Sequence, residues 1–474
     1  MVPFNRNDIE ILYRSIGGIE LYILGCSSSV YDTEKLGKYY ACKGEDAVII
    51  GTCSVIELEE RFSQWLASVV KLLYVDKKVY VLGCDVCNNR DAYIGYNGIY
   101  DVNEVLDKTK GIYSAGFKDS RNKIIIKIED GCCYKCSYCI INQIRANPIY
   151  IKPYKDICKE IEECIKNYEG KIDIYLTGTE VGIYRDKEYK YDLVDLIDNI
   201  YKAFSSKINK ISIYSIDPGL PVCRKLIKYI GLHKDYCLSH INMSVQYADD
   251  SILKVMGRRH SVKDLYDIHA LANEYGVTLG WEIMVGFPGE TEETFNNTLF
   301  VMKDLRPLRN SLFIYSKRKG TVAYDLGEQV SENIKRNRFN RLSLVNDEIR
   351  KTYSEEITSI SDSYGEGYDK NIKDVSRIQY DIEDSERLKK IDITSIEGYV
   401  RDIQTIKDSD ILYFTYDERY EYELLFGIVF LRLKYNNDIW INTKENVEII
   451  DNLYKLSSNE IIDKKRNIII MKPI

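Results

Sequence analysis

Three cysteines in one short segment carry the clearest chemical signal in the sequence. Residues 131–139 read GCCYKCSYC, which spaces Cys132, Cys136 and Cys139 as Cys-x3-Cys-x2-Cys. Three thiolates from one loop can bind three irons of a four-iron cluster, and the fourth iron is then open to a small molecule that the cluster can reduce. The alternative is a zinc knuckle, which needs a fourth ligand. Cys133 could supply it, but adjacent cysteines are poorly placed to bind one ion, so the spacing favours an iron–sulfur cluster.

A second set of cysteines falls at the ends of three predicted strands. Short, apolar, β-branched runs predict buried parallel strands at 19–24, 47–50 and 79–82. Cys26, Cys53 and Cys84 closely follow these runs. Ligands of open α/β sheets bind outside the carboxyl ends of the strands, so these cysteines can converge although they are distant in the chain. The competing interpretation is ordinary burial, since free cysteine is among the most buried residue types. We treat Cys133 as a bystander of the loop and the other cysteines as structural: Cys42, Cys87, Cys158, Cys164, Cys223 and Cys237.

The predicted elements place both sets at strand ends, and the predicted fold class is α/β. Residues 18–115 alternate strand patterns with helix-like spacing at 32–40 and 57–73, and predict an N-terminal open α/β domain. Residues 120–330 repeat the alternation and predict a (β/α) partial barrel, whose active site should lie at the C-terminal ends of its strands. Residues 331–360 predict a helical connector, and 361–474 a mixed α+β or β-rich C-terminal domain. The barrel strands are predicted at 123–128, 172–176, 211–214, 241–245, 278–285 and 311–315.

The composition is that of a protein with substantial buried cores. The 474 residues are 45% hydrophobic and 29% charged, and the formal net charge of −7 does not make the whole molecule an electrostatic clamp for nucleic acid. Residues 1–17 lack the apolar region of a signal peptide. The apolar runs are shorter than the ~20 residues of a membrane span. We expect a cytoplasmic, reducing location without a membrane partner, where clustered cysteines bind metal more often than they form disulfides.

Short motifs in a fixed order give the cysteines a family context. They are Gly25-Cys26, Thr52-Cys53, Val81-Leu-Gly-Cys84, the cluster loop with Arg145, Leu176-Thr-Gly178, Ser215-Ile-Asp-Pro218, His240-Ile-Asn-Met-Ser-Val-Gln246, Met256-Gly-Arg-Arg259, Val285-Gly-Phe-Pro-Gly-Glu-Thr291 and Tyr315-Ser-Lys-Arg318. Through these motifs the chain resembles the radical S-adenosylmethionine methylthiotransferases over about residues 18 to 345. It is most like the subgroup that acts on threonylcarbamoyladenosine in tRNA. It departs from the family pattern in the cluster loop at Asn142 and Ala146. It also departs at Ser27 to Ser29, at Gly51 and near Ile56, which puts the surroundings of the second cysteine set in doubt.

The resemblance implies two 4Fe-4S clusters and S-adenosylmethionine (SAM) as cofactors. The cluster on Cys132, Cys136 and Cys139 would cleave SAM to a 5′-deoxyadenosyl radical. An auxiliary cluster on the second cysteine set, Cys26, Cys53 and Cys84, would carry the sulfur that is inserted. The resemblance further implies SAM contacts at Tyr138, Thr177, Gly178, Gln246 and Glu282. For Gln246 and Glu282, a polar role inside the barrel is an equal alternative. An electron donor such as flavodoxin or ferredoxin, and a sulfur donor, would be partners; no further catalytic residue is identified.

The substrate that the resemblance implies is C2 of a modified adenosine in tRNA. Members of the subgroup usually end in a small basic β-barrel that binds RNA. Residues 361–420 instead contain 15 Asp and Glu against nine Lys and Arg, and an acidic domain is a poor clamp for phosphates. The alternative is a peptide or protein substrate, such as a ribosomal protein or a ribosomally made peptide. It would pair with strand-like runs at 411–416, 422–433 and 439–442. A catalytically inactive cluster scaffold is a third hypothesis, which the intact cysteine loop argues against.

Overall fold

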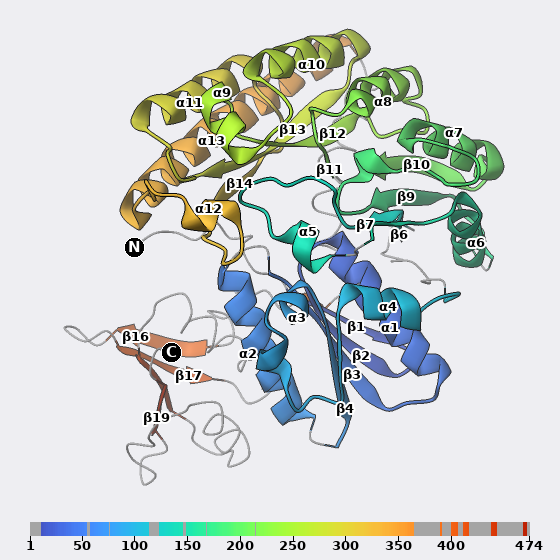
Figure 1. Ribbon diagram of the computed structural model, residues 1–474, viewed down its shortest axis with the longest axis vertical. Helices are drawn as coiled ribbons and strands as arrows, with labels where there is room; N and C mark the ends of the chain where they lie inside the picture. The colour runs from blue at the N-terminus through green and yellow to red at the C-terminus, as the bar shows by residue number, and fades with distance from the viewer. Residues whose placement is uncertain are drawn as a thin grey trace.

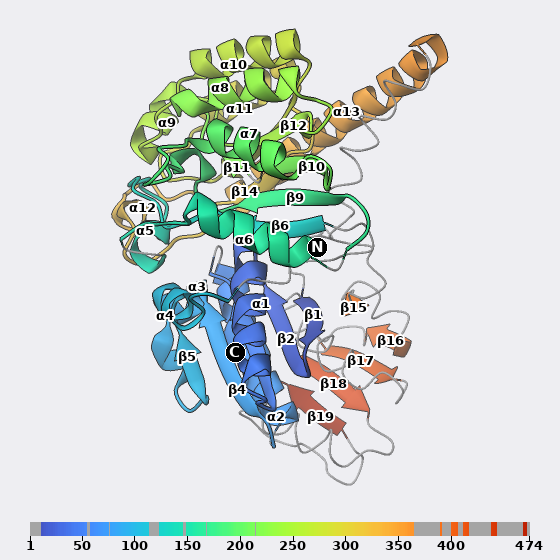
Figure 2. The same cartoon turned by 90° about the vertical axis from the view of Figure 1, so that its right-hand side faces the viewer.

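The computed structural model describes most of the first 364 residues. The described ranges are 11–54, 57–74, 76–112, 123–145, 148–166, 168–213 and 215–364, with short strands at 389–390, 400–405, 411–416, 438–442 and 468–471. Figures 1 and 2 show an N-terminal α/β unit (blue) that lies against a larger unit of parallel strands and outer helices (teal to orange). The predicted α/β class is confirmed.

A six-stranded sheet in the order β15-β1-β2-β3-β4-β5 forms the N-terminal unit. In chain order its strands are β1 (Ile11–Ile16), β2 (Ile19–Leu24), β3 (Ala47–Thr52), β4 (Lys78–Gly83), β5 (Gly98–Tyr100) and β15 (Lys389–Lys390). Strands β2 to β5 pair in parallel, and β1 pairs antiparallel with β2. Strands β2, β3 and β4 are buried over nearly their whole length, as the uninterrupted apolar runs predict.

Helices follow the three cysteine-ending strands. They are α1 (Ser27–Cys42), α2 (Glu57–Leu73) and α3 (Cys84–Asn88), and α4 (Val102–Lys108) comes after β5. Helix α1 contacts β2 and β3 of its own sheet and β6 of the larger unit, so it lies at the boundary between the two units. The sequence predicts this helix only from residue 32, whereas the structure begins it directly after Cys26, its N-cap residue. Three serines in its first turn hide the start, because serine is a weak helix former.

The larger unit contains two parallel sheets. The first has the order β10-β9-β6 and the second β11-β12-β13-β14. Their strands are β6 (Lys123–Lys127), β9 (Ile172–Thr177), β10 (Ile208–Ile213), β11 (Ser215–Ile216), β12 (His240–Gln246), β13 (Thr278–Val285) and β14 (Ser311–Ile314). Every predicted barrel strand is present within a few residues of its expected bounds. The two sheets form the partial barrel that the alternation predicts.

Outer helices cover the barrel strands (Figure 1). They are α6 (Tyr154–Ile165), α7 (Leu193–Phe204), α8 (Pro221–Leu232), α9 (Asp250–Met256), α10 (Val262–Tyr275) and α11 (Glu292–Leu305). Helices α7 and α10 begin with capping boxes, at Asp192 and Ser261, which satisfy backbone donors of the first turn. The fully buried Trp281 of β13 donates a hydrogen bond from Nε1 to His269 Nε2 at 3.0 Å. This contact anchors α10 to the strand that it covers.

The C-terminal part begins with the long helix α13 (Glu332–Tyr364), which matches the predicted connector. The short strand β15 (Lys389–Lys390) then pairs with β1, so the C-terminal segment adds an edge strand to the N-terminal sheet. The remaining described strands form one sheet: β16 (Val400–Thr405), β17 (Ile411–Tyr416), β18 (Asp438–Asn442) and β19 (Ile468–Met471). The predicted runs at 411–416 and 439–442 coincide with β17 and β18. The run at 422–433 lies outside the described residues, and the domain boundaries stay predictions.

Among the described helices, none combines the length and the apolar character that crossing a bilayer requires.

Candidate functional site

The cysteine loop joins two short elements at the barrel mouth. It runs from β7 (Glu129–Asp130) to α5 (Ile141–Ile144) and contains Cys132, Cys136 and Cys139. The Cys139 amide donates to the Cys136 carbonyl at 3.0 Å, which closes a turn between these two cysteines. Ser137 anchors the loop: its amide donates to the Met256 carbonyl at 2.9 Å, and its carbonyl accepts from the Ala323 amide at 2.8 Å. The loop conformation is thus set by the barrel as well as by local spacing.

The three loop cysteines are half-buried and lie near one another. Burial raises the pKa of Cys132 to about 12, and the nearby Cys139 adds to the shift. Burial also raises the pKa of Cys139 to about 11, with a contribution from Cys136. Thiols with such pKa values are protonated at neutral pH unless a metal ion displaces the proton.

The strand-end cysteines also come together. Cys26 follows β2, Cys53 follows β3, and Cys84 starts α3 after β4. Cys53 and Cys84 are buried, whereas Cys26 is exposed. Burial raises the pKa of Cys53, and so does Glu59, whose carboxylate accepts a hydrogen bond from the Cys53 thiol at 3.0 Å. Cys84 and Cys26 add smaller effects in the same direction, so the three thiols are neighbours. Gly25 has a φ of +101°, and a Cβ there would lie 3.2 Å from the Cys53 sulfur, so only glycine leaves room beside this thiol.

The two cysteine sets face the same boundary between the units. Cys84 belongs to a small apolar cluster with Ile140 and Ile144, which flank the loop on its C-terminal side. Cys84 also contributes to the raised pKa of Cys139, after burial and the effect of Cys136. The parallel strands of both units therefore end toward a shared region that contains six cysteines.

The donor chemistry of both sets suits iron–sulfur clusters. Each set offers three thiols, which can bind three of the four irons in a 4Fe-4S cluster. Within the described part of the chain, no three His, Cys, Asp or Glu side chains converge closely enough to bind a single metal ion. A four-iron cluster does not require that convergence, because each thiolate binds a different iron.

Arg258 is a site residue that the sequence reasoning did not single out. Its Nη1 lies 3.6 Å from the Cys136 sulfur and 3.5 Å from the Tyr138 hydroxyl. Its Nη2 lies 3.1 Å from Asp217 Oδ2 and donates to the Ser244 carbonyl. A buried arginine held on a carboxylate can orient both the tyrosine and the thiol. Its position in the motif Met256-Gly-Arg-Arg259 is the only sequence signal that points to it.

The predicted SAM contacts at the end of β9 serve visible structural roles. The Thr177 hydroxyl hydrogen-bonds the Ser27 hydroxyl at 2.6 Å, next to Cys26 in the other unit. A Cβ at Gly178 would collide with the carboxylate of Glu129. Glu129 accepts a hydrogen bond from the Glu180 amide at 2.6 Å, and burial raises the pKa of both carboxyls, that of Glu180 to about 7. Two buried acids therefore lie behind Cys132, and Glu180 was not among the predicted residues.

The remaining predicted contacts lie on neighbouring strands of the second sheet. Gln246 ends β12 with a φ of +67°, beside a register shift in the pairing with β13. A non-glycine residue in this conformation is strained, and such strain is concentrated at functional sites. Glu282 lies on β13; burial raises its pKa, and the charge of Arg258 opposes that shift. Tyr138 and Glu282 thus share the neighbourhood of Arg258, while the assignment of all five residues to SAM stays a prediction.

Comparison with known proteins defines the class. The family model of the radical SAM superfamily matches residues 126–302, which hold the cysteine loop and most barrel strands. The chain therefore contains a radical SAM domain. Among solved structures, the radical SAM methyltransferase TsrM from Kitasatospora setae aligns with a TM-score of 0.47 and 13% identity, over 62% of this chain and 74% of that chain.

The curated relatives narrow the class. The chain is 34% identical over 276 residues to the tRNA-2-methylthio-N(6)-dimethylallyladenosine synthase of Clostridium tetani, which covers 57% of this chain and 59% of that protein. It is 25% identical over 375 residues to the threonylcarbamoyladenosine tRNA methylthiotransferase MtaB of Bacillus subtilis, with coverages of 71% and 82%. The Natranaerobius thermophilus tRNA-2-methylthio-N(6)-dimethylallyladenosine synthase matches at 28% over 414 residues, with coverages of 77% and 89%. The predicted resemblance is confirmed: the chain contains a radical SAM domain and is similar, at modest identity over much of its length, to tRNA methylthiotransferases.

Proposed function

We propose that this protein inserts a methylthio group at C2 of a modified adenosine in tRNA. The observation that carries the proposal is the meeting of two cysteine sets at one boundary, where Cys84 packs with Ile140 and Ile144 of the loop segment. One set of three thiols suits a cluster that generates a radical. A second set within reach of it suits a cluster that holds the sulfur to be transferred, and this pairing separates sulfur insertion from other radical chemistry.

The loop residues would bind the radical-generating cluster and SAM. When bound at Cys132, Cys136 and Cys139, a 4Fe-4S cluster supplies the electron that cleaves SAM. Arg258 holds the Tyr138 hydroxyl and approaches Cys136, so it fixes the aromatic ring beside the loop. The buried Glu180 carboxyl, whose pKa burial raises to about 7, lies close enough to Cys132 to act on its pKa and suits the ammonium group of SAM.

The strand-end residues would bind the auxiliary cluster. Cys26 is the exposed member of that set, and Ser27 next to it hydrogen-bonds Thr177 of the barrel. This bond fixes the sulfur-bearing side of the N-terminal unit against the end of β9. A target carbon held between the two cluster sites would be within reach of both the radical and the sulfur, which the transfer requires.

The identity of the nucleoside rests on the relatives. Their names include both dimethylallyladenosine and threonylcarbamoyladenosine modification of tRNA, so both modified adenosines are candidates. The peptide alternative depended on the acidic C-terminal region and on strand-like runs that could pair with a peptide. Two of these runs are β17 and β18, and both are interior strands of their sheet, so neither offers a free edge for pairing. A tRNA substrate, reduced thiols, a flavodoxin- or ferredoxin-type electron donor and a sulfur donor together suit a cytoplasmic enzyme.

The test is a reaction with defined components. The anaerobically reconstituted full chain is incubated with SAM, dithionite and tRNA from a strain without 2-methylthio modification. We expect 5′-deoxyadenosine and a 2-methylthio nucleoside by mass spectrometry. Parallel reactions with tRNA that carries only one of the two modified adenosines decide between the nucleosides. If 5′-deoxyadenosine forms and neither tRNA gains a methylthio group, the tRNA proposal is wrong and the peptide alternative is tested next.

A further inference from the structure

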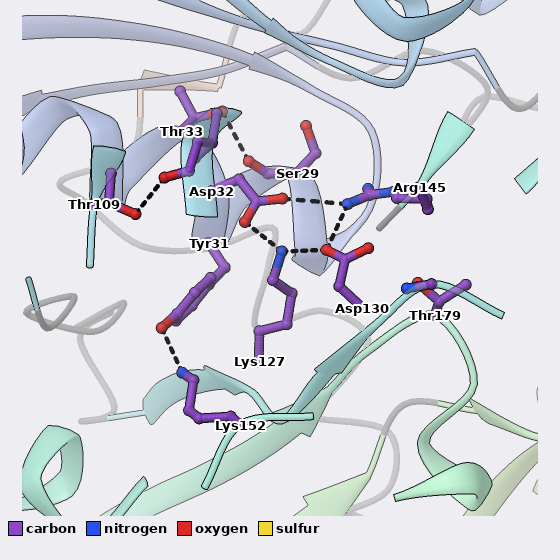
Figure 3. A network of polar contacts seen from close by, with 12 residues as sticks. Ser29, Tyr31, Asp32, Thr33, Thr109, Lys127, Asp130, Arg145, Lys152 and Thr179 are labelled. Atoms are coloured by element: carbon purple, nitrogen blue, oxygen red, sulfur yellow. Dashed lines mark hydrogen bonds and ion pairs between the residues drawn. The ribbon is translucent and has the colours of Figure 1, made fainter. Parts of the chain in front are cut away.

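A buried network of charges crosses the boundary between the two units (Figure 3). Asp32 comes from α1, whereas Lys127, Asp130 and Arg145 come from the barrel unit. Lys127 contacts Asp32 and lies 2.5 Å from Asp130, and Arg145 Nη1 lies 3.2 Å from Asp32 and 3.1 Å from Asp130. All four side chains are at most 5% exposed. Two cations and two carboxylates thus form a charge-balanced group.

Arg145 is also the cation of this group that acts on the strand-end cysteines. It directly follows Ile144, which packs against Cys84. Its guanidinium group lies within side-chain hydrogen-bonding reach of the Cys84 thiol.

The orientation of the guanidinium group is consistent with a second partner. Both carboxylates contact Nη1 of the guanidinium group. A guanidinium carries five donors in a fixed, planar arrangement, so the aspartates orient the group and leave donors available on its other edge. Asp32 and Asp130 therefore hold Arg145 in place rather than use all of its donors.

We propose that Arg145 is a positioning residue for the auxiliary cluster, which places a fixed positive charge beside the Cys84 thiolate and raises the reduction potential of that cluster. The inference rests on the proposed function, because it requires a cluster at Cys26, Cys53 and Cys84. One-electron reduction makes a bound 4Fe-4S cluster more negative by one charge. A nearby buried cation stabilises the reduced form more than the oxidised form, and hydrogen bonds to the sulfurs act in the same direction.

The experiment isolates the auxiliary cluster in the full chain. Replacement of Cys132, Cys136 and Cys139 by Ala removes the other cluster, and the reduction potential is measured by redox titration followed by electron paramagnetic resonance. In this background Arg145→Gln should lower the reduction potential of the auxiliary cluster. Each tenfold change in the one-electron equilibrium corresponds to a shift of about 59 mV. Arg145→Lys keeps the charge and should shift it less. The opposite sign is expected for Asp130→Asn, which removes a negative charge near Cys84.

A matched control is Lys152→Gln. Lys152 is an equally buried cation at the same boundary, but it contacts Tyr31 at 2.6 Å and Glu160 at 2.6 Å rather than a thiol (Figure 3). We expect no shift in this variant. Equal reduction potentials of the auxiliary cluster in the Arg145→Gln and Lys152→Gln proteins would overturn the inference. If the Arg145→Gln protein does not retain a cluster, the Asp130→Asn protein decides instead, and a fall in its reduction potential would overturn the inference. A parent triple variant that binds no iron would instead refute the proposed function.

Discussion

The two cysteine sets are built in different ways. The loop set lies within eight consecutive residues, Cys132 to Cys139, and hydrogen bonds from the loop to Met256 and Ala323 hold it. The strand-end set comes from three separate strands, β2, β3 and β4, whose order in the sheet brings Cys26, Cys53 and Cys84 together. The first site depends on local spacing and the second on sheet topology. The loop site should therefore respond mainly to changes within the loop, and the strand-end site to changes in packing between the units.

The largest expected effect comes from the loop set. Replacement of Cys132, Cys136 or Cys139 by Ala removes one of three ligands, and SAM cleavage should be abolished. The measurement is 5′-deoxyadenosine after anaerobic reduction with dithionite. Iron at the strand-end set should remain, at roughly half of the wild-type content if each site binds a four-iron cluster. Cleavage that survives in all three variants would contradict the assignment of the loop.

The second effect separates the two sets. Simultaneous Cys26→Ala, Cys53→Ala and Cys84→Ala should leave SAM cleavage in place and stop methylthio insertion, because the proposed function assigns the transferred sulfur to this set. The measurement pairs 5′-deoxyadenosine with the methylthio nucleoside in one reaction. Cys87→Ala is the matched control, since Cys87 lies one helical turn from Cys84 and should be dispensable. A triple variant that still methylthiolates tRNA would show that the clusters are wrongly assigned.

A smaller effect sharpens the description of the loop site. Arg258→Gln removes the side chain that approaches Cys136 and the Tyr138 hydroxyl, and SAM cleavage should fall about 10- to 100-fold, the usual range for a residue that orients a metal ligand. Arg259→Gln is the control, because Arg259 pairs with the same Asp217 but lies over the Tyr134 ring. Iron content is measured in both proteins. A fall of equal size in both would mean that the charge on Asp217, rather than the contact with the loop, is what matters.

The smallest effect concerns the barrel away from both sites. Burial lowers the pKa of His269 to about 4, and its Nε2 accepts the Trp281 hydrogen bond. Because the folded pKa lies below the ordinary value of about 6.5, unfolding takes up a proton between these pH values. Stability is thus full above pH ~6.5 and falls as the pH drops toward 4, by at most about 1.4 kcal/mol per pH unit for one proton. Denaturant unfolding of wild type and His269→Gln over this range should show a shallower slope in the variant.

Most of the fold was predictable because its signals are local. The buried parallel strands are uninterrupted apolar runs, and the barrel helices carry caps that the sequence displays. The start of α1 was not predictable, since three serines in the first turn oppose helix propensity and the fold overrides it. The pairing of Lys389–Lys390 with β1 joins segments more than 370 residues apart, and no local pattern encodes such a contact.

The sequence by itself determined the chemistry of the loop set and the strand-end position of the other three cysteines, because spacing and apolar periodicity are properties of short segments. Only the tertiary structure decided which polar side chains surround them. Arg145 reaches the Cys84 neighbourhood because Asp32 and Asp130, from different units, hold its guanidinium group. Arg258 reaches Cys136 from more than 120 residues away. Such buried charges are placed by the packing of distant elements, and a single sequence contains no periodic signal for that packing.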